Sequence, residues 1–412
     1  MANETFKFGG TKWAVKNGSV LAYNNENNNF KPLPFDFTRA STATRVNEDS
    51  LIEVVKSGIP RIDYLDNPNG HLLLEPSRTN IVPYSEDFSN GNWAKSNLNT
   101  TGTPPWSNVA IAPDGETTAD KFIVSQDVSS KRHQISYTFS ATTSIVSFSV
   151  FLKSAEKTSI SIMLSSSGIA CAASANLNNE TISIVYASNV ISTSTSIEDY
   201  GSGWYRCRVT AQNTSSGINN ITIYDDSIGD GISGVYMWGA QVEEGSYATS
   251  YIPTSGTTET RVAETCTGAG NAQVFNDSEG VLFAHFKCLS NISSFERVIS
   301  IYQGTLVTNS IRINFHSSEN FSFYQKYVGS VRTTNLSTTI INKTNLNKIA
   351  IRYNSSSFDV YVNGVEILTN ADANAFTNPL NSFGFSNFDG QIKQIGVYDT
   401  ALTDEELETL TT

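Results

Sequence analysis

The sequence has little of several features that mark other classes of protein. Its 412 residues include four cysteines and 16% charged residues, and no run of lysine and arginine occurs. The cysteines are few and show no CxxC spacing, which argues against a disulfide framework and a zinc ribbon. Proteins that grip nucleic-acid phosphates need clustered cations. The formal net charge here is −12, so we expect no nucleic-acid partner.

Long apolar runs are missing as well. No stretch of 18 apolar residues is present, and the N-terminus, MANETFKFGG, lacks the apolar region of a signal peptide. We therefore expect no membrane insertion and a soluble product that folds in a reducing cytoplasm. A role outside the cell would then require release by lysis or assembly into a particle.

The chain instead shows alternating apolar and polar residues. Val146, Phe148, Val150 and Leu152 alternate with polar or outward positions, as in a β-strand with one buried face. Similar patterns recur between Ser/Gly/Asn-rich turns, and Asn363-Gly364 marks a hairpin. We predict an all-β fold: two tandem antiparallel β-sandwiches (jelly rolls) after an extended N-terminal segment. One short C-terminal helix is expected after Thr403, where Glu406 completes a capping box.

We predict three segments: residues 1–80 as an extended attachment and oligomerisation segment, 81–264 as the first sandwich and 265–412 as the second. The apparent strands within 1–80 are too short to be stable alone. We therefore expect them to pad the next domain or pack against sister chains, which favours a homotrimer. Gly239 interrupts a strand that begins at Gly234, where a bulge or a close backbone approach is expected.

Three sets of residues carry a resemblance to known proteins. The stretch Phe35–Trp93, with FDFTRASTATRV, IPRIDY, LLLEPSRTN and YSEDFSN, resembles the leader of many tailed-phage structural proteins of the tail-fibre or head-fibre type. GWYRCRV at 203–209 and the segment 234–264 are similar to a carbohydrate-binding-module-like jelly roll. FDVYVNGVEI at 358–367 and FDGQIKQIGVYDTALTDEEL at 388–407 resemble a laminin-G/concanavalin-A-like domain. The resemblance implies an N-terminal region that docks on other virion proteins.

No catalytic set is recognisable in the sequence. Neither Ser-His-Asp nor HExxH spacing is present. Neighbouring acids such as Asp225 and Asp226 point to opposite faces of an extended chain and cannot converge. Glycoside hydrolysis needs two facing carboxylates, which distant positions can still supply. We therefore predict a protein that is not an enzyme, and polysaccharide hydrolysis stays as an alternative.

Glycan binding is the sharper functional hypothesis. Aromatic rings stack on the C–H faces of sugars, and the aromatic residues that we select for this role are Trp106, Tyr137, Tyr200, Tyr324 and Tyr327. Trp106 follows two prolines in a loop, and loops carry function more often than strands do. For most of the others, packing in a strand is the stronger interpretation. Ca²⁺, which both resembled folds often carry, would be held by the oxygen-rich loop of Asp225, Asp226 and Asp230, although a plain polar connection explains that loop as well.

The resulting hypothesis is a virion appendage protein of the fibre or spike type. It presents lectin-like domains for binding a host-surface glycan, and it attaches to other virion proteins through its N-terminal segment. A polysaccharide depolymerase is one alternative. A head-fibre or decoration protein with a purely structural role is another.

Overall fold

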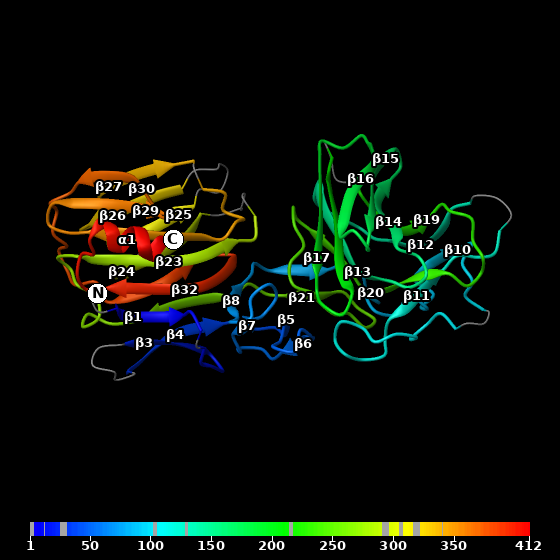
Figure 1. The fold of residues 1–412 in the computed structure, drawn as a ribbon, viewed down its shortest axis with the longest axis horizontal. Helices are drawn as coiled ribbons and strands as arrows, with labels where there is room; N and C mark the ends of the chain where they lie inside the picture. Colours follow the sequence, from blue (N-terminus) through cyan, green and yellow to red (C-terminus); the bar gives the residue numbers. More distant parts are fainter. Residues whose placement is uncertain are drawn as a thin grey trace. The chain divides into compact units, whose positions relative to one another are not determined.

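The computed structural model describes residues 4–11, 13–24, 31–101, 105–127, 131–213, 217–290, 296–304, 308–315, 322–339 and 341–412. The regular structure of these described residues is nearly all antiparallel β-strand, with a single short helix. The all-β prediction is therefore confirmed. The chain divides into two compact units (Figure 1). Unit 1 contains residues 1–42, 55–76 and 262–412, and unit 2 contains residues 43–54 and 77–261.

Unit 1 is a sandwich built from both ends of the sequence. One row of strands runs β27–β26–β25–β24–β31–β22–β4–β3, and the other runs β30–β29–β28–β23–β32. Beyond β32 lie β1 and β8. The bounds of its elements are β1 Glu4–Gly9, β2 Val15–Lys16, β3 Ser19–Asn24, β4 Lys31–Thr38, β7 Arg61–Asp63, β8 His71–Leu74, β22 Thr265–Ala269, β23 Gly280–Cys288, β24 Arg297–Gln303, β25 Asn309–Phe315, β26 Ser322–Val328, β27 Val331–Thr338, β28 Asn347–Tyr353, β29 Ser357–Val362, β30 Val365–Ala371, β31 Ser382–Ser386, β32 Gly390–Tyr398 and α1 Asp404–Thr411.

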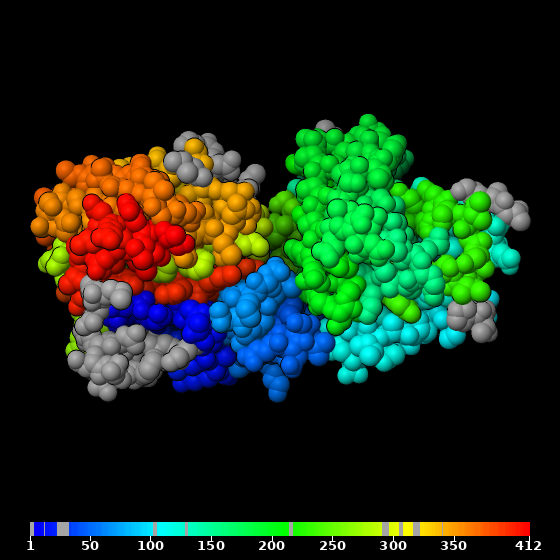
Figure 2. Space-filling view, viewed as in Figure 1, coloured from blue at the N-terminus to red at the C-terminus, as the bar shows by residue number. Residues whose placement is uncertain are grey.

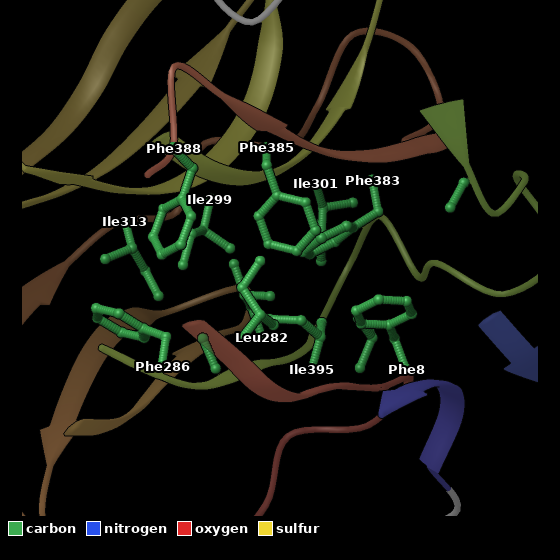
Figure 3. Packing of buried hydrophobic residues seen from close by; sticks show 14 of the residues in the cluster. Phe8, Leu282, Phe286, Ile299, Ile301, Ile313, Phe383, Phe385, Phe388 and Ile395 are labelled. Carbon is green, nitrogen blue, oxygen red and sulfur yellow. The ribbon is translucent and has the colours of Figure 1, made fainter. Parts of the chain in front are cut away.

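The core of unit 1 lies between these two rows. In Figure 3, Phe8 from β1 and Ile395 from β32 point toward the phenylalanines of β31, with Leu282 beside them. Phe8 and Phe35 meet edge to face at a centroid distance of 4.9 Å. The N-terminal strands are therefore part of this core.

This arrangement differs from the predicted division at residues 80 and 264. Phe6 and Phe8 are fully buried within their own chain, and β1 pairs along β32. Residues 43–54, in contrast, belong to unit 2. The argument for a trimer, that residues 1–80 cannot bury themselves without sister chains, therefore does not hold for the described strands. Local sequence patterns could not reveal that β1 pairs with β32, because the two strands lie so far apart in the sequence.

Four charged residues form a buried network in unit 1. The carboxylate of Glu264 accepts hydrogen bonds from Arg39 Nη1 at 2.7 Å, Arg61 Nε at 2.9 Å and the backbone N–H of Glu75 at 3.0 Å. Arg61 Nη1 also lies 2.8 Å from a carboxylate oxygen of Glu75, and all four side chains are almost inaccessible. Burial alone would lower the pKa of Arg61, but Glu264 and Glu75 outweigh it and raise that pKa. In the sequence, the four residues lie near the positions at which the chain changes from one unit to the other, which are 42/43, 54/55, 76/77 and 261/262.

The C-terminal helix follows its sequence signals. Glu406 N–H donates to Thr403 Oγ1 at 3.3 Å, and the Glu406 carboxylate accepts from Thr403 N–H at 3.0 Å. The predicted capping box is thus present. Leu407 is fully buried against Val281 and Phe283, and Figure 2 shows the helix in red on the surface of unit 1.

Unit 2 is a second sandwich of two antiparallel sheets. One sheet runs β10–β12–β19–β14–β15–β16, and the other runs β11–β20–β13–β18–β17. Gly239 on β20 has φ +63°, and the register with β13 shifts beside it, which confirms the predicted bulge. The bounds of its elements are β5 Ala43–Val46, β6 Ile52–Val55, β9 Arg78–Asn80, β10 Ala94–Ser96, β11 Asp120–Ile123, β12 His133–Thr138, β13 Ile145–Ser154, β14 Ser159–Ser166, β15 Ile169–Asn176, β16 Thr181–Ser188, β17 Ser192–Asp199, β18 Trp204–Gln212, β19 Asn220–Asp225, β20 Gly234–Glu244 and β21 Glu259–Arg261.

The four cysteines, Cys171, Cys207, Cys266 and Cys288, are buried and free. Burial raises the pKa of the Cys207 thiol to about 12, so it behaves as a small core residue. In the described residues, no helix is long and apolar enough to cross a bilayer.

Candidate functional site

The strands β24, β25 and β26 turn their apolar residues toward the core of unit 1 and a set of polar residues toward the opposite face of the sheet. Ile299, Ile313 and Tyr324 belong to the core of unit 1. Because side chains alternate along a strand, the intervening residues lie on the opposite face of the sheet. There Ser300 is opposite Arg312, and Arg312 is opposite Gln325. We call this set of residues the Arg312 face. It consists of Ser300, Ser310, Arg312, Asn314 and Gln325, which are buried (0–5% exposed), and of Tyr327, which is half-buried.

Arg312 is the charged centre of this face. Its guanidinium carbon lies 3.9 Å from the centroid of the Tyr327 ring, and its Nε donates to Ser310 Oγ at 3.1 Å. Burial lowers the pKa of Arg312, against smaller opposing effects of Tyr327 and Glu296, yet a guanidinium keeps its charge in proteins. A cation over an aromatic face is stabilised by about 0.5–2 kcal/mol. The contact therefore holds the Tyr327 ring against the planar guanidinium group of Arg312.

Three polar atoms on the Arg312 face are buried without a hydrogen-bond partner. They are Ser300 Oγ, Asn314 Oδ1 and Gln325 Oε1, and all three residues belong to the described part of the chain. Leaving such a group unpaired costs about 1–3 kcal/mol, and most buried polar atoms in proteins are paired. Three of them on neighbouring strands make the Arg312 face a candidate binding site.

The structure separates the two tyrosines that the sequence selects in this region. Tyr327 is half-buried on the Arg312 face, whereas Tyr324 is fully buried in the core. Its hydroxyl has no hydrogen-bond partner, and burial raises its pKa. A sugar cannot stack on a ring that is closed off in this way, so only Tyr327 stays a candidate of the pair.

Among the candidates in unit 2, Tyr200 is buried and meets Phe151 edge to face at 4.9 Å, so it is a packing residue. Trp106 and Tyr137 are half-buried at the margin of the unit 2 core. The Trp106 ring lies 5.8 Å from Lys95 Nζ, and Tyr137 lies 5.7 Å from Trp93. Both keep some exposed surface and stay predictions. Pro104, which precedes the Trp106 loop, lies outside the described residues.

The proposed calcium ligands do not fit a metal. Asp225 is paired with Lys157 at 2.9 Å, and Asp226 with Arg132 at 2.9 Å. Asp230 accepts from the N–H groups of its own loop and from Ser233, which lower its pKa to about 2. These carboxylates already have their own partners. The described residues contain no group of three or more His, Cys, Asp or Glu side chains arranged for a metal ion.

Unit 2 nevertheless has a cation-binding cup, which a side chain fills. Lys95 Nζ donates to the backbone carbonyls of Ser89, Asn90 and Trp93 at 3.2, 2.9 and 2.9 Å. Carbonyl oxygens are the ligands that hard cations also use. Burial lowers the pKa of Lys95, while Asp87 and Asp120 oppose this effect. The ammonium group thus ties the loop before β10 together.

Comparison with known proteins finds a family model that is similar to part of unit 1. Residues 282–408 match the laminin-G-type family model of the concanavalin A-like lectin/glucanases superfamily. The predicted sandwich fold of the C-terminal part is therefore confirmed, and the Arg312 face lies within the matched residues. A comparison with curated proteins gave no match.

Several solved structures match about a third of the chain or slightly more. The CBM40 domain of the Ruminococcus gnavus IT-sialidase is 18% identical, with a TM-score of 0.30, over 35% of this chain and 94% of that one. Domain 4 of AbnA, a GH43 arabinanase from Geobacillus stearothermophilus, is 15% identical, with a TM-score of 0.30, over 41% and 83%. The exoplasmic/lumenal domain of VIP36 is 13% identical, with a TM-score of 0.27, over 34% and 76%. At these scores the likenesses do not decide a ligand.

Sequence analysis missed Ser300, Arg312, Asn314 and Gln325. A signal was present, because the strands ISIYQ, IRINF and FYQKYV place Ser, Arg, Asn and Gln at alternate positions. What the sequence could not show is that these three strands lie side by side.

Proposed function

We propose that this protein binds a carbohydrate on the Arg312 face and acts as an adhesion subunit of a tailed-phage particle. The observation that carries the binding proposal is the group of three buried, unpartnered polar atoms beside the Arg312–Tyr327 stack. Sugars offer C–H faces to aromatic rings and hydroxyls to Asn, Gln, Ser and Arg. The lectin/glucanase family match over residues 282–408 supports this class of ligand.

Binding is tested on a glycan array with the full chain and the variant Tyr327→Ala. We expect the wild type to bind a subset of glycans and the variant to lose at least tenfold in affinity, because the stacking platform and the support of Arg312 disappear. Tyr186→Ala is the matched control, since Tyr186 is an exposed tyrosine on a strand of unit 2 (55% exposed). A blank array for the wild type contradicts the proposal.

The phage assignment rests on the leader resemblance between Phe35 and Trp93. Attachment to other virion proteins and the homotrimer belong to this proposal, although the burial of β1 removes the original argument for a trimer. Light scattering on the purified protein measures the number of chains. Immunogold imaging of particles locates the protein and separates a receptor-binding fibre from a head-fibre or decoration protein.

Hydrolysis is the second candidate, because the matched family includes glucanases as well as lectins. Glu296 is a carboxylate beside the Arg312 face, where it accepts from Asn314 Nδ2 at 2.9 Å. Glycoside hydrolysis takes two carboxyl groups across the bond. Release of reducing ends from host polysaccharide by the purified chain would favour this function over adhesion.

A further inference from the structure

The two amides of the Arg312 face have fixed orientations. Gln325 Nε2 donates to Asn335 Oδ1 at 2.8 Å, and Asn314 Nδ2 donates to Glu296 Oε2 at 2.9 Å. In each amide the NH₂ group therefore faces a protein acceptor, and the carbonyl oxygen is the atom left over. Both carbonyl oxygens are buried and unpartnered, and so is Ser300 Oγ. Two of the three unpartnered atoms on this face are therefore hydrogen-bond acceptors only.

We infer that the ligand is a neutral saccharide that donates hydroxyl hydrogens to Gln325 Oε1 and Asn314 Oδ1. This inference rests on the proposed carbohydrate binding. An amide oxygen can only accept, so the group opposite it must carry O–H or N–H. A carboxylate or sulfate placed against either oxygen offers only acceptors and leaves that oxygen unpaired, which a binding site penalises more strongly than the loss of an apolar contact.

An acidic glycan is the competing class, because the face also contains cations. Arg312 is joined by Arg332, which is paired in register with Tyr327 and lowers the pKa of Arg312. Glu296 acts in the opposite direction on the same guanidinium. The net charge of −12 adds a long-range repulsion of anions. The face thus carries two cations, Arg312 and Arg332, and one anion, Glu296. The choice of the neutral class rests on the two carbonyl acceptors.

The unpartnered atoms give this inference a distinctive signature. Removing a buried, unpaired hydroxyl relieves its desolvation cost, so the folded protein becomes more stable or stays as stable. If Ser300 Oγ contacts the ligand, Ser300→Ala lowers affinity about 2- to 12-fold, the value of one neutral hydrogen bond. Stability and affinity then change in opposite directions, which a merely structural serine does not produce.

Ser322→Ala is a matched control. Ser322 is fully buried with an unpartnered Oγ, as Ser300 is. It lies on β26 in the same alternation as Tyr324, so its side chain faces the core. We expect Ser322→Ala to keep or raise the melting temperature like Ser300→Ala and to leave glycan affinity unchanged.

The probes are oligogalactosides and the corresponding oligogalacturonates, which differ only in a CH₂OH or a carboxylate at C6, together with neutral oligosaccharides of glucose and mannose. Calorimetric titration of the full chain should give at least tenfold tighter binding of a neutral probe than of any uronate, with the Ser300→Ala loss described above. Tighter binding of uronates, or an unchanged affinity of Ser300→Ala for a bound neutral probe, overturns the inference while carbohydrate binding stands. No binding in either class overturns the proposed function as well.

Discussion

Replacing Glu264 by Gln should strongly destabilise unit 1. The carboxylate of Glu264 accepts from two arginines and one backbone N–H in a site closed to water. A glutamine of the same size keeps one acceptor but turns an NH₂ group toward the guanidinium groups. It also leaves Arg39 and Arg61 with only the Glu75 carboxylate in the network. Breaking a buried ion pair from one side costs about 3–5 kcal/mol.

That cost corresponds to a melting temperature lower by about 6–20 °C, at about 2–4 °C for each kcal/mol in a unit of this size. Calorimetry on the full chain measures both units. Tryptophan fluorescence reports mainly on unit 2, because Trp93, Trp106, Trp204 and Trp238 lie there and only Trp13 lies in unit 1. We expect the calorimetric transition of unit 1 to shift while the fluorescence transition stays in place.

Asp226→Asn is the control for this experiment. The Arg132–Asp226 pair has a distance of 2.9 Å, similar to those in the buried network, but its side chains are 43% and 53% exposed. Exposed pairs contribute about 0–1 kcal/mol, so this variant should melt within a few degrees of the wild type. A Glu264→Gln variant that also melts within 2 °C of the wild type would show that the buried network does not stabilise unit 1.

Three further predictions follow from other parts of the molecule. Lys95→Met should destabilise unit 2 by about 1–3 kcal/mol, because three carbonyls lose their donor. EDTA should not change the urea midpoint of the wild type, because the Lys95 ammonium group occupies the place of a cation. A urea midpoint that falls with EDTA would contradict this interpretation. His71 is buried with neither ring nitrogen hydrogen-bonded, 3.6 Å from Asp63, and burial, followed by the charges of Lys393, Lys287 and Arg61, lowers its pKa to about 3. The unfolded chain therefore takes up that proton first, so stability contributed by neutral His71 is complete above about pH 6.5 and is lost toward pH 3; His71→Leu should flatten the dependence of the unfolding free energy on pH in this window, and an unchanged slope would refute it. A fragment of residues 265–412 should fail to fold, as judged by circular dichroism and solubility, since it lacks the core residues Phe6, Phe8 and Phe35; a cooperative melt of the fragment would disprove this.

The sequence predicted those features that depend on neighbouring residues. The capping box at Thr403, the bulge at Gly239 and the Asn363-Gly364 turn, with φ of 49° and 84°, are set by residues a few positions apart. The pairing of β1 with β32 was not predictable, because no local periodicity names a partner strand so far away. Tyr324 and Tyr327 show the same limit at the site. Aromatic residues occupy both alternating sets in FYQKYV, so the pattern cannot tell which set faces the core.

The quoted leader stretches TRAS, IPRIDY and LLLEP contain Arg39, Arg61 and Glu75, and RVAE contains Glu264. These residues have a structural role inside unit 1, since all four meet in the buried network. The charged residues of these three stretches are thus part of the packing of unit 1.

The pairing of the two ends of the chain has a consequence during synthesis. Thr5 Oγ1 donates to the carbonyl of Val397, 392 residues later. A ribosome that adds about 5–20 residues per second needs about 20–80 s to cover that distance. Throughout this time the first phenylalanines emerge without the strand that covers them, while every segment of unit 2 has been made once residue 261 leaves the ribosome. We expect the inserted sandwich to fold first and the nascent N-terminus to be the segment that chaperones must protect.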